Sequence, residues 1–273
     1  MKPLQDKIAV VLGASAEGGT GWAIAEALAA AGARVLVAAR SLAPLQRLAD
    51  RIGGHALACD AGDETQVCEL ADTALRLHGR LDIAVNAAGL PVLGSIADST
   101  DEALETALRV NYLGNVYFVK HMARAIDADG AITLISSMST THPLFPHFAY
   151  ACAKSATDCL VRYAALEYGA RGIRVNSVLP GAILSDLARE LFADERIRQV
   201  FEKEVPLGRL GLPADFANAV LWLSGPAYVT GLNLQVNGGN HLSRFPYLGE
   251  LPGAEQAYDG AGTPLFDREQ SRA

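Results

Sequence analysis

Residues 7–21 read KIAVVLGASAEGGTG, an apolar run that leads directly into a glycine-rich turn. Residues 7–12 predict a buried strand, and an alanine-rich helix is predicted over residues 21–31, ending at Gly32. Glycines between a strand and a helix let the backbone come close to a diphosphate at the helix N-terminus. A tight structural turn would use the same residues, so the stretch alone predicts a βα unit with a candidate phosphate loop.

The same alternation of strand and helix signals continues along the chain. Further strands are predicted over residues 34–39, 55–58, 81–85, 131–136, 173–178 and 232–236, and helical segments over 43–52, 64–78, 100–126, 150–168, 186–204 and 213–223. Alternating elements of this kind predict an α/β fold: a Rossmann-type doubly wound parallel sheet of about seven strands, with helices on both faces. No linker or repeat divides residues 1–240, which we expect to form one domain.

Composition narrows the class of protein. The chain has 273 residues, of which 50% are hydrophobic and 19% charged, so a large core is expected and disorder is not. The net charge of −7 argues against binding to nucleic acid or an anionic membrane. No apolar run approaches the roughly 20 residues of a membrane span, and the N-terminal apolar run reads as a strand and not as a signal peptide.

The four cysteines and six histidines show no metal-ligand spacing and no Cys-x-x-Cys pair. We therefore expect a metal-free, cytoplasmic protein with reduced and mostly buried cysteines. Cys152 lies between Tyr150 and Lys154 but points to another side of the predicted helix, so packing is favoured over reactivity.

A second informative stretch is residues 137–154, SMSTTHPLFPHFAYACAK. Tyr150 and Lys154 are four apart, so on a helix they share one face. An ammonium group beside a phenol favours the phenolate and lowers the phenol pKa from about 10, which suits a general acid or base for an alcohol–ketone pair. Ser137, at the end of a predicted strand, could donate a hydrogen bond to the same substrate oxygen. A surface tyrosine and lysine would give the same spacing, so the pair gains weight only from Ser137 and the glycine turn.

With these motifs in this order, the chain resembles the single-domain short-chain dehydrogenase/reductases over about residues 5–240. The resemblance implies a nicotinamide cofactor and a catalytic set of four residues. Tyr150 would exchange the proton, Lys154 would lower its pKa and hold the ribose, and Ser137 would orient the carbonyl. Asn111, in VNYLG, would anchor a water of a proton relay.

The resemblance also assigns cofactor contacts to the ends of the strands. The positions carried over are Gly13, Ser15, Gly19, Gly21, Arg40, Asp60, Asn86, Gly89, Tyr150, Lys154, Pro180, Gly181, Ile183 and Ser185. At the end of the second strand an NAD site usually has a carboxylate, but this chain has Ala39 followed by Arg40. Because arginine binds phosphate bidentately, NADP is predicted, with NAD as the alternative.

Several positions depart from the family pattern. Five residues instead of three separate Gly13 from Gly19, which predicts a phosphate loop enlarged by two residues. Glu17 stands where a basic residue would support NADP, Ala87 replaces an asparagine, and Ser185 replaces a threonine. The cofactor site is still predicted with these changes, but the role of each glycine in the phosphate loop is not assigned.

The substrate side carries less information. The candidate substrate residues are Met138, His142, Phe145, His147, Leu187 and Phe192. Most are apolar, which predicts a hydrophobic or cyclic secondary alcohol or ketone as substrate; the alternative is that they pack a lid onto the core. The two histidines could contact a polar substrate group, although loop histidines are more often solvated.

Residues 241–273 run past the usual end of the family and are rich in glycine and proline, with spaced aromatics. They predict either a partly disordered tail or an arm that covers the substrate mouth or a subunit interface. The resemblance further implies a homotetramer or homodimer built on helices 100–126 and 150–168. Rival functions are a 3-oxoacyl thioester reductase of the same family, which would share every motif, and a non-catalytic nucleotide-binding sensor, which usually loses the tyrosine or lysine.

Overall fold

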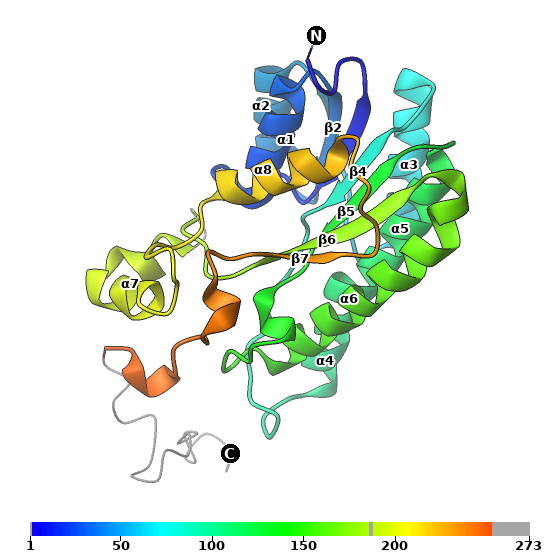
Figure 1. The fold of residues 1–273 in the computed structure, drawn as a ribbon. Helices are drawn as coiled ribbons and strands as arrows, with labels where there is room; N and C mark the ends of the chain where they lie inside the picture. Colours follow the sequence, from blue (N-terminus) through cyan, green and yellow to red (C-terminus); the bar gives the residue numbers. More distant parts are fainter. Residues whose placement is uncertain (1, 186–187, 253–273) are drawn as a thin grey trace.

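The computed structural model describes residues 2–185 and 188–252 and places a single seven-stranded parallel sheet at the centre of the protein (Figure 1). The strand order is β3-β2-β1-β4-β5-β6-β7. The strands are β1 (Ile8–Leu12), β2 (Arg34–Ala39), β3 (His55–Ala58), β4 (Ile83–Asn86), β5 (Ala131–Ile135), β6 (Arg174–Pro180) and β7 (Asn233–Val236). The predicted doubly wound α/β fold is confirmed, and each predicted strand is present to within two residues at either end.

The order of the strands fixes where a ligand can bind. The chain runs outward from β1 to β2 and β3, then returns to place β4 on the other side of β1. Leu12 is therefore paired with Ala38 on one side and with Asn86 on the other. Because the crossovers leave β1 and β4 in opposite directions, a crevice opens between them at the carboxyl ends of the strands.

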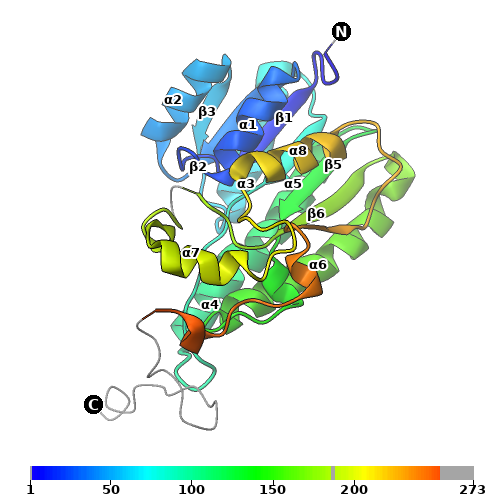
Figure 2. The same cartoon turned by 60° about the vertical axis from the view of Figure 1, so that its left-hand side comes forward.

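Helices cover both faces of the sheet (Figures 1 and 2). One face packs against α1 (Thr20–Ala30), α2 (Leu42–Ile52) and α8 (Pro213–Ser224), and the other against α3 (Glu64–His78), α5 (Gly114–Ala125) and α6 (Phe148–Tyr168). The five inner strands (β1, β2, β4, β5 and β6) are rich in valine, isoleucine, leucine and alanine and are buried on both faces, as expected for a parallel sheet. Two apolar clusters result, one on each side of the sheet.

The long helix predicted over residues 100–126 is interrupted. It consists of α4 (Asp101–Leu108), a π-helical turn (Arg109–Leu113) and α5, so the region is helical as predicted, with its interruption around Asn111. The interruption frees the carbonyl of Asn111, which accepts hydrogen bonds from Thr157 Oγ1 at 2.6 Å and from Asn115 Nδ2 at 2.8 Å. Single π-turns inside α-helices are frequent at functional sites.

The segment after β6 is less helical than predicted. Within residues 188–204 only a short 3-10 turn (Leu191–Ala193) and α7 (Glu195–Glu202) form, and the Asp194 side chain caps α7 by accepting from Arg196 N. In Figures 1 and 2, α7 and residues 237–252 lie at the carboxyl ends of the strands.

Cysteine placement departs from the sequence prediction. Cys59 is buried, but Cys152 and Cys159 are exposed on α6, so the expectation that Cys152 packs is wrong for the isolated chain. Among residues 2–185 and 188–252, no group of three or more histidine, cysteine, aspartate or glutamate side chains could hold a metal ion. No helix in the same part of the chain is both long and apolar enough to cross a membrane.

Candidate active site

Two neighbouring cavities occupy the crevice at the carboxyl ends of the strands. The larger has a volume of about 560 Å³ and the smaller about 430 Å³. Both are lined by Gly13 at the end of β1 and by residues 87–89 at the end of β4, so they meet at the switch point of the sheet. The larger cavity extends across the ends of β5 and β6, and the smaller one across the ends of β2 and β3.

Two positions of the glycine-rich turn, Gly13 and Gly21, have no space for a side chain. Gly13 has φ +90°, and a Cβ atom there would lie 2.3 Å from Ala88 N. A Cβ atom on Gly21 would lie 2.3 Å from the Gly13 carbonyl oxygen. The turn ends at Gly19, which precedes α1 and supplies no side chain to cap its N–H groups. Uncapped N–H groups at the start of a helix bind phosphate, so this turn fits the diphosphate of a dinucleotide.

The smaller cavity fits the adenosine end of such a ligand. Its lining includes Ser15, Arg40, Asp60 and Gly89, all predicted cofactor residues. Arg40 is exposed, and Asp60 Oδ1 accepts a hydrogen bond of 2.8 Å from Gly62 N. The Asp60 carboxylate therefore also serves the alternative role of a turn cap.

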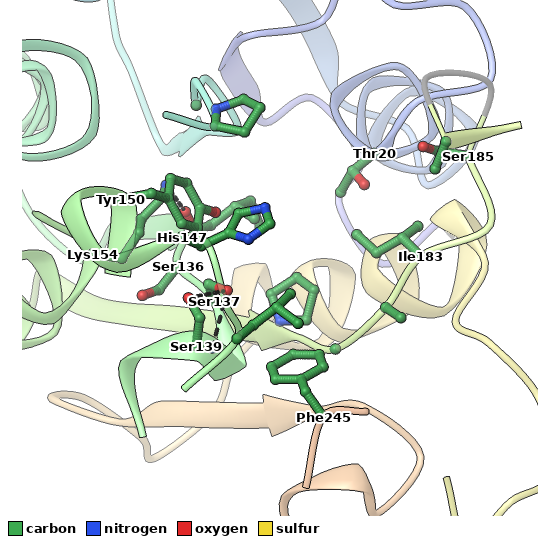
Figure 3. Close-up of a pocket in the computed structure, with 18 of the residues that line it drawn as sticks. Thr20, Ser136, Ser137, Ser139, His147, Tyr150, Lys154, Ile183, Ser185 and Phe245 are labelled. Atoms are coloured by element: carbon green, nitrogen blue, oxygen red, sulfur yellow. Dashed lines mark hydrogen bonds between the residues drawn. The ribbon is translucent and has the colours of Figure 1, made fainter. Parts of the chain in front are cut away.

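The larger cavity brings the predicted catalytic side chains together (Figure 3). Ser137, Tyr150 and Lys154 lie on one side, and Thr20, Ile183 and Ser185 on the opposite side. Lys154 Nζ lies 5.7 Å from the centre of the Tyr150 ring. Ser137 Oγ accepts hydrogen bonds from Ser139 Oγ at 2.9 Å and from Ser139 N at 3.2 Å, which leaves its own proton for the tyrosine or a substrate oxygen.

The electrostatics of this group differ from the sequence prediction. Burial raises the pKa of Tyr150 to about 12, and the hydrogen bond with Ser137 counteracts this rise only in part. Burial also lowers the pKa of Lys154 to about 8, against the nearby Asp158 carboxylate, which raises it. Lys154 Nζ donates a 2.7 Å hydrogen bond to the Ile135 carbonyl and lies over the tyrosine ring. The expectation that Lys154 lowers the Tyr150 pKa is therefore not met by the residues themselves.

Asn111 is fully buried beside this group. Its Nδ2 donates to the Leu90 and Ala107 carbonyls at 2.9 and 3.1 Å, and its Oδ1 accepts from Leu90 N at 3.0 Å. A Cβ atom on Gly89 would lie 3.5 Å from both Asn111 Oδ1 and Lys154 Nζ, so the asparagine and the lysine both approach Gly89 on the side where a Cβ atom would project. Asn111 thus positions the loop after β4, and its predicted role in a proton relay stays a prediction.

Asn86 has a structural role in this structure. Its Nδ2 donates to Asn115 Oδ1 at 2.9 Å, and its Oδ1 accepts from Ala88 N at 3.0 Å. The side chain lines neither cavity, unlike the backbone of residues 87–89 that follows it. The four positions after β6 (Pro180, Gly181, Ile183 and Ser185) all line the larger cavity.

The predicted substrate residues divide into three groups. Phe145, His147 and Phe192 line the larger cavity. Met138 is fully buried in the core and does not line it, because the 3-10 turn after β5 directs that side chain inward. His142 is also outside the lining, with its Nδ1 2.9 Å from Thr141 Oγ1, and Leu187 lies outside the described residues.

Sequence reasoning missed part of the cavity wall. Further lining residues include Thr20, Pro91, Ser139, Pro146, Phe245, Pro246 and Leu251. Of these, Phe245 is 6% exposed and comes from the segment predicted as a tail. That segment is anchored: Arg244 pairs with Glu204 at 3.0 Å and with Glu250 at 2.6 Å. The spaced aromatics were the signal for this contact, but they did not indicate which residue reaches the cavity.

The chain is similar in sequence and in fold to several known proteins. A family model described as Enoyl-(Acyl carrier protein) reductase matches residues 13–241. A 7alpha-hydroxysteroid dehydrogenase from Escherichia coli (strain K12) is 36% identical over 249 residues, covering 86% of this chain and 94% of that protein. A short-chain type dehydrogenase/reductase from Mycobacterium ulcerans superposes with a TM-score of 0.88 at 30% identity, covering 95% of this chain and 98% of that one. A variant of actinorhodin polyketide ketoreductase solved with NADPH gives a TM-score of 0.81 at 27% identity, covering 86% and 97%.

Proposed function

The chain belongs to the short-chain dehydrogenase/reductase family, and on that premise we propose that it interconverts a secondary alcohol and a ketone on a hydrophobic or cyclic small molecule with NADP as cofactor. At the coarser level it is an NAD(P)-dependent oxidoreductase. The observation that carries the proposal is the position of Ser137, Tyr150 and Lys154 on one side of a mainly apolar cavity that continues into a glycine-lined dinucleotide site.

Ser137, Tyr150 and Lys154 have different roles at the substrate oxygen. Ser137 donates a hydrogen bond that orients the carbonyl, since its own oxygen already accepts from Ser139. Tyr150 donates the proton in reduction and receives it in oxidation. Lys154, 2% exposed and fixed on the Ile135 carbonyl, supplies positive charge beneath the phenol ring. The nicotinamide carries the hydride, and the protein supplies position and electrostatics.

The residues that would hold the cofactor come from the ends of four strands, β1, β2, β3 and β6. The glycine turn would take the diphosphate, Asp60 and Arg40 the adenosine end, and residues 180–185 the nicotinamide end. NADP is proposed over NAD because Arg40 and no carboxylate follows β2. The structural neighbour solved with NADPH supports this choice.

The apolar wall supports a ring-containing substrate. Phe145, Phe192, Phe201 and Phe245 come from three separate segments and all line the larger cavity. A cavity of about 560 Å³ is within the usual range for a small-molecule site. Two of the similar proteins, named for a hydroxysteroid and for a polyketide, act on substrates of this kind by their names.

A 3-oxoacyl thioester reductase is the second candidate. The description of the matching family model, which names an acyl carrier protein reductase, favours it. Such an enzyme needs an open entrance for a carrier-bound chain, whereas here Phe245 and Leu251 add to the cavity wall. A 3-oxoacyl thioester therefore belongs in the same substrate panel as the cyclic ketones.

We propose further that the protein is a cytoplasmic homodimer or homotetramer. The exposed apolar side chains include Tyr163 and Leu166 on α6, 64% and 82% exposed, and Trp222 and Tyr228 at and just after the end of α8. Cys152 and Cys159 also lie exposed on α6. A partner subunit on α6 would cover these side chains, which would account for cysteines on the outer face of this helix.

The decisive experiment is NADPH oxidation with a panel of cyclic, aromatic and steroid-like ketones together with a 3-oxoacyl thioester. The wild type should turn over at least one ring ketone, and Tyr150→Phe should reduce kcat by a factor of about 10² to 10⁴. Turnover that survives Tyr150→Phe would refute the assigned chemistry. Preference for the thioester would replace the proposed substrate with the second candidate.

A further inference from the structure

The polar side chains around the larger cavity fall into two groups with one exception. Ser136, Ser137, Ser139, Tyr150 and Lys154 form the reaction centre, and Thr20 and Ser185 lie on the opposite side. Within the described part of the lining, His147 is the remaining polar side chain. Its neighbours in the wall, Leu144, Phe145 and Pro146, are apolar.

His147 is held firmly at the start of α6. Its backbone N–H donates to the Leu144 carbonyl at 2.9 Å, and its carbonyl accepts from Ala151 N at 2.8 Å. The neighbouring loop is joined to the same position, because Gly94 N donates to the Pro146 carbonyl at 2.8 Å. The imidazole meets the Tyr150 ring edge-on, with ring centres 6.3 Å apart, and projects into the cavity in Figure 3.

The two ring nitrogens have different surroundings. Nδ1 is enclosed by protein. Burial lowers the pKa of His147, and a hydrogen bond between the ring and the Leu144 backbone opposes this fall in part, so the ring is neutral at neutral pH and carries one proton. A neutral imidazole has one nitrogen that donates a hydrogen bond and one that accepts one. Nε2 is the nitrogen left for a ligand in the cavity.

We propose that His147 selects substrates that carry a second, uncharged hydroxyl, with Nε2 hydrogen-bonded to a hydroxyl on the same ring as the reacting carbonyl or on the adjacent ring. A hydroxyl can donate or accept, so it suits either tautomer of the neutral imidazole. The His147 and Tyr150 rings meet with their centres 6.3 Å apart, so the second oxygen is expected on the same small ring system as the reacting oxygen that Tyr150 holds. This inference rests on the proposed ketone reductase activity and deepens it: the substrate is an oxygenated ring ketone and not a plain hydrocarbon ketone.

The test compares 1-tetralone with its 5-, 6- and 7-hydroxy derivatives in NADPH-dependent reduction. For the wild type, kcat/KM for the best hydroxytetralone should exceed that for 1-tetralone by about tenfold, the effect of one neutral hydrogen bond. In His147→Phe, which keeps an aromatic ring and loses both nitrogens, this preference should fall to within about twofold, with turnover of 1-tetralone largely kept. His147→Gln, which keeps an N–H donor, should retain part of the preference.

The outcomes separate the inference from the proposed function. Equal loss of activity on all four ketones in His147→Phe would show a purely structural role and overturn the inference. A wild-type preference near one would overturn it without any variant, so the test does not depend on the folding of His147→Phe. Absence of turnover for every ketone of the panel would instead refute the proposed function, and this inference with it.

Discussion

The titration of Tyr150 is the sharpest test of the active-site electrostatics. Burial raises the pKa of this phenol from 10.0 to about 12. The change corresponds to about 3 kcal/mol against the phenolate. At pH 7 only about one phenol in 100,000 would then be ionised. Tyr150 is therefore ready to donate a proton for ketone reduction, and in the absence of further positive charge it is a poor base for alcohol oxidation.

The additional charge has to come from the oxidised cofactor, because burial lowers the pKa of Lys154 to about 8 and leaves its amine largely uncharged at the pH where the phenol ionises. A unit positive charge within about 6 Å contributes about 3 kcal/mol at an effective dielectric constant of about 20. This energy would lower the Tyr150 pKa by about two, to near 10. We therefore predict that the oxidised cofactor changes the Tyr150 pKa strongly and that loss of Lys154 changes it little.

The assay is ultraviolet difference absorbance near 295 nm, where ionised tyrosine absorbs. The chain has eight tyrosines, so the signal of Tyr150 is obtained by subtracting the titration of Tyr150→Phe from that of the wild type. Without nucleotide the two curves should coincide up to about pH 11. With saturating NADP⁺ a single phenol should ionise about two pH values lower.

Lys154→Met is the matched control for the source of the charge. Since burial lowers the pKa of Lys154 to about 8, its amine is largely uncharged where Tyr150 ionises without nucleotide, and this variant should leave the nucleotide-free titration of Tyr150 nearly unchanged. A nucleotide-free pKa at or below 10 for Tyr150 would refute the dominance of burial. A rise of the pKa by two or more in Lys154→Met would restore the lysine as the main source.

Four further predictions follow from single features of the structure. Burial lowers the pKa of Lys154 from 10.5 to about 8, so between pH 8 and 10.5 the unfolded state binds more protons than the folded state. The unfolding free energy of the wild type should therefore rise over this range by about 3 kcal/mol compared with that of Lys154→Met. An unfolding free energy that changes equally with pH in the two proteins would contradict this. Arg40→Asp should shift the NADP/NAD ratio of kcat/KM by about 100-fold toward NAD, the effect of losing a charge-assisted pair and adding repulsion; an unchanged ratio would remove the argument for NADP. Gly13→Ala should cost more than about 2 kcal/mol of unfolding free energy because backbone blocks its Cβ, whereas the control Gly79→Ala, open but at φ +73°, should cost only about 1 kcal/mol. Phe245→Ala should raise KM for ring ketones several-fold with kcat nearly kept, and a KM equal to that of the wild type would show that this side chain does not contact substrate.

The sheet could be predicted from the sequence because its strands are short apolar runs that end in recognisable turns. The apolar run before Gly13 and the one before Asn86 both end where backbone must bend, and the structure ends β1 and β4 at those positions. The relation between Tyr150 and Lys154 was also predictable, since four residues on one helix define a common face. The strand ends and the shared helix face both depend on residues close together in the sequence, so the sequence alone is enough to predict them.

The electrostatics of the same pair were not predictable from spacing. The four-residue separation brings Lys154 beneath Tyr150, but it does not determine which acceptor the ammonium takes. That acceptor is the carbonyl of Ile135 on β5, nineteen residues earlier in the chain. The form of the helix interruption at Asn111, a π-helical turn, was not predictable for the same reason, because the hydrogen bonds of Asn111 with Leu90 and Thr157 join three different segments.

The substrate wall depends most on contacts between distant segments. Phe145 precedes α6, Phe201 lies on α7, and Phe245 follows β7, yet all three line one cavity. None of these segments shows a periodicity that would indicate which side chain faces the ligand, and Met138 faces the core although it lies in the same loop as Phe145. The proton-transfer residues lie at one strand end and on one helix, while the residues of the wall come from these three segments. Substitutions in the wall should therefore change the preferred ketone without changing the Tyr150 chemistry, which is why the preference ratio at His147 tests substrate choice separately from turnover.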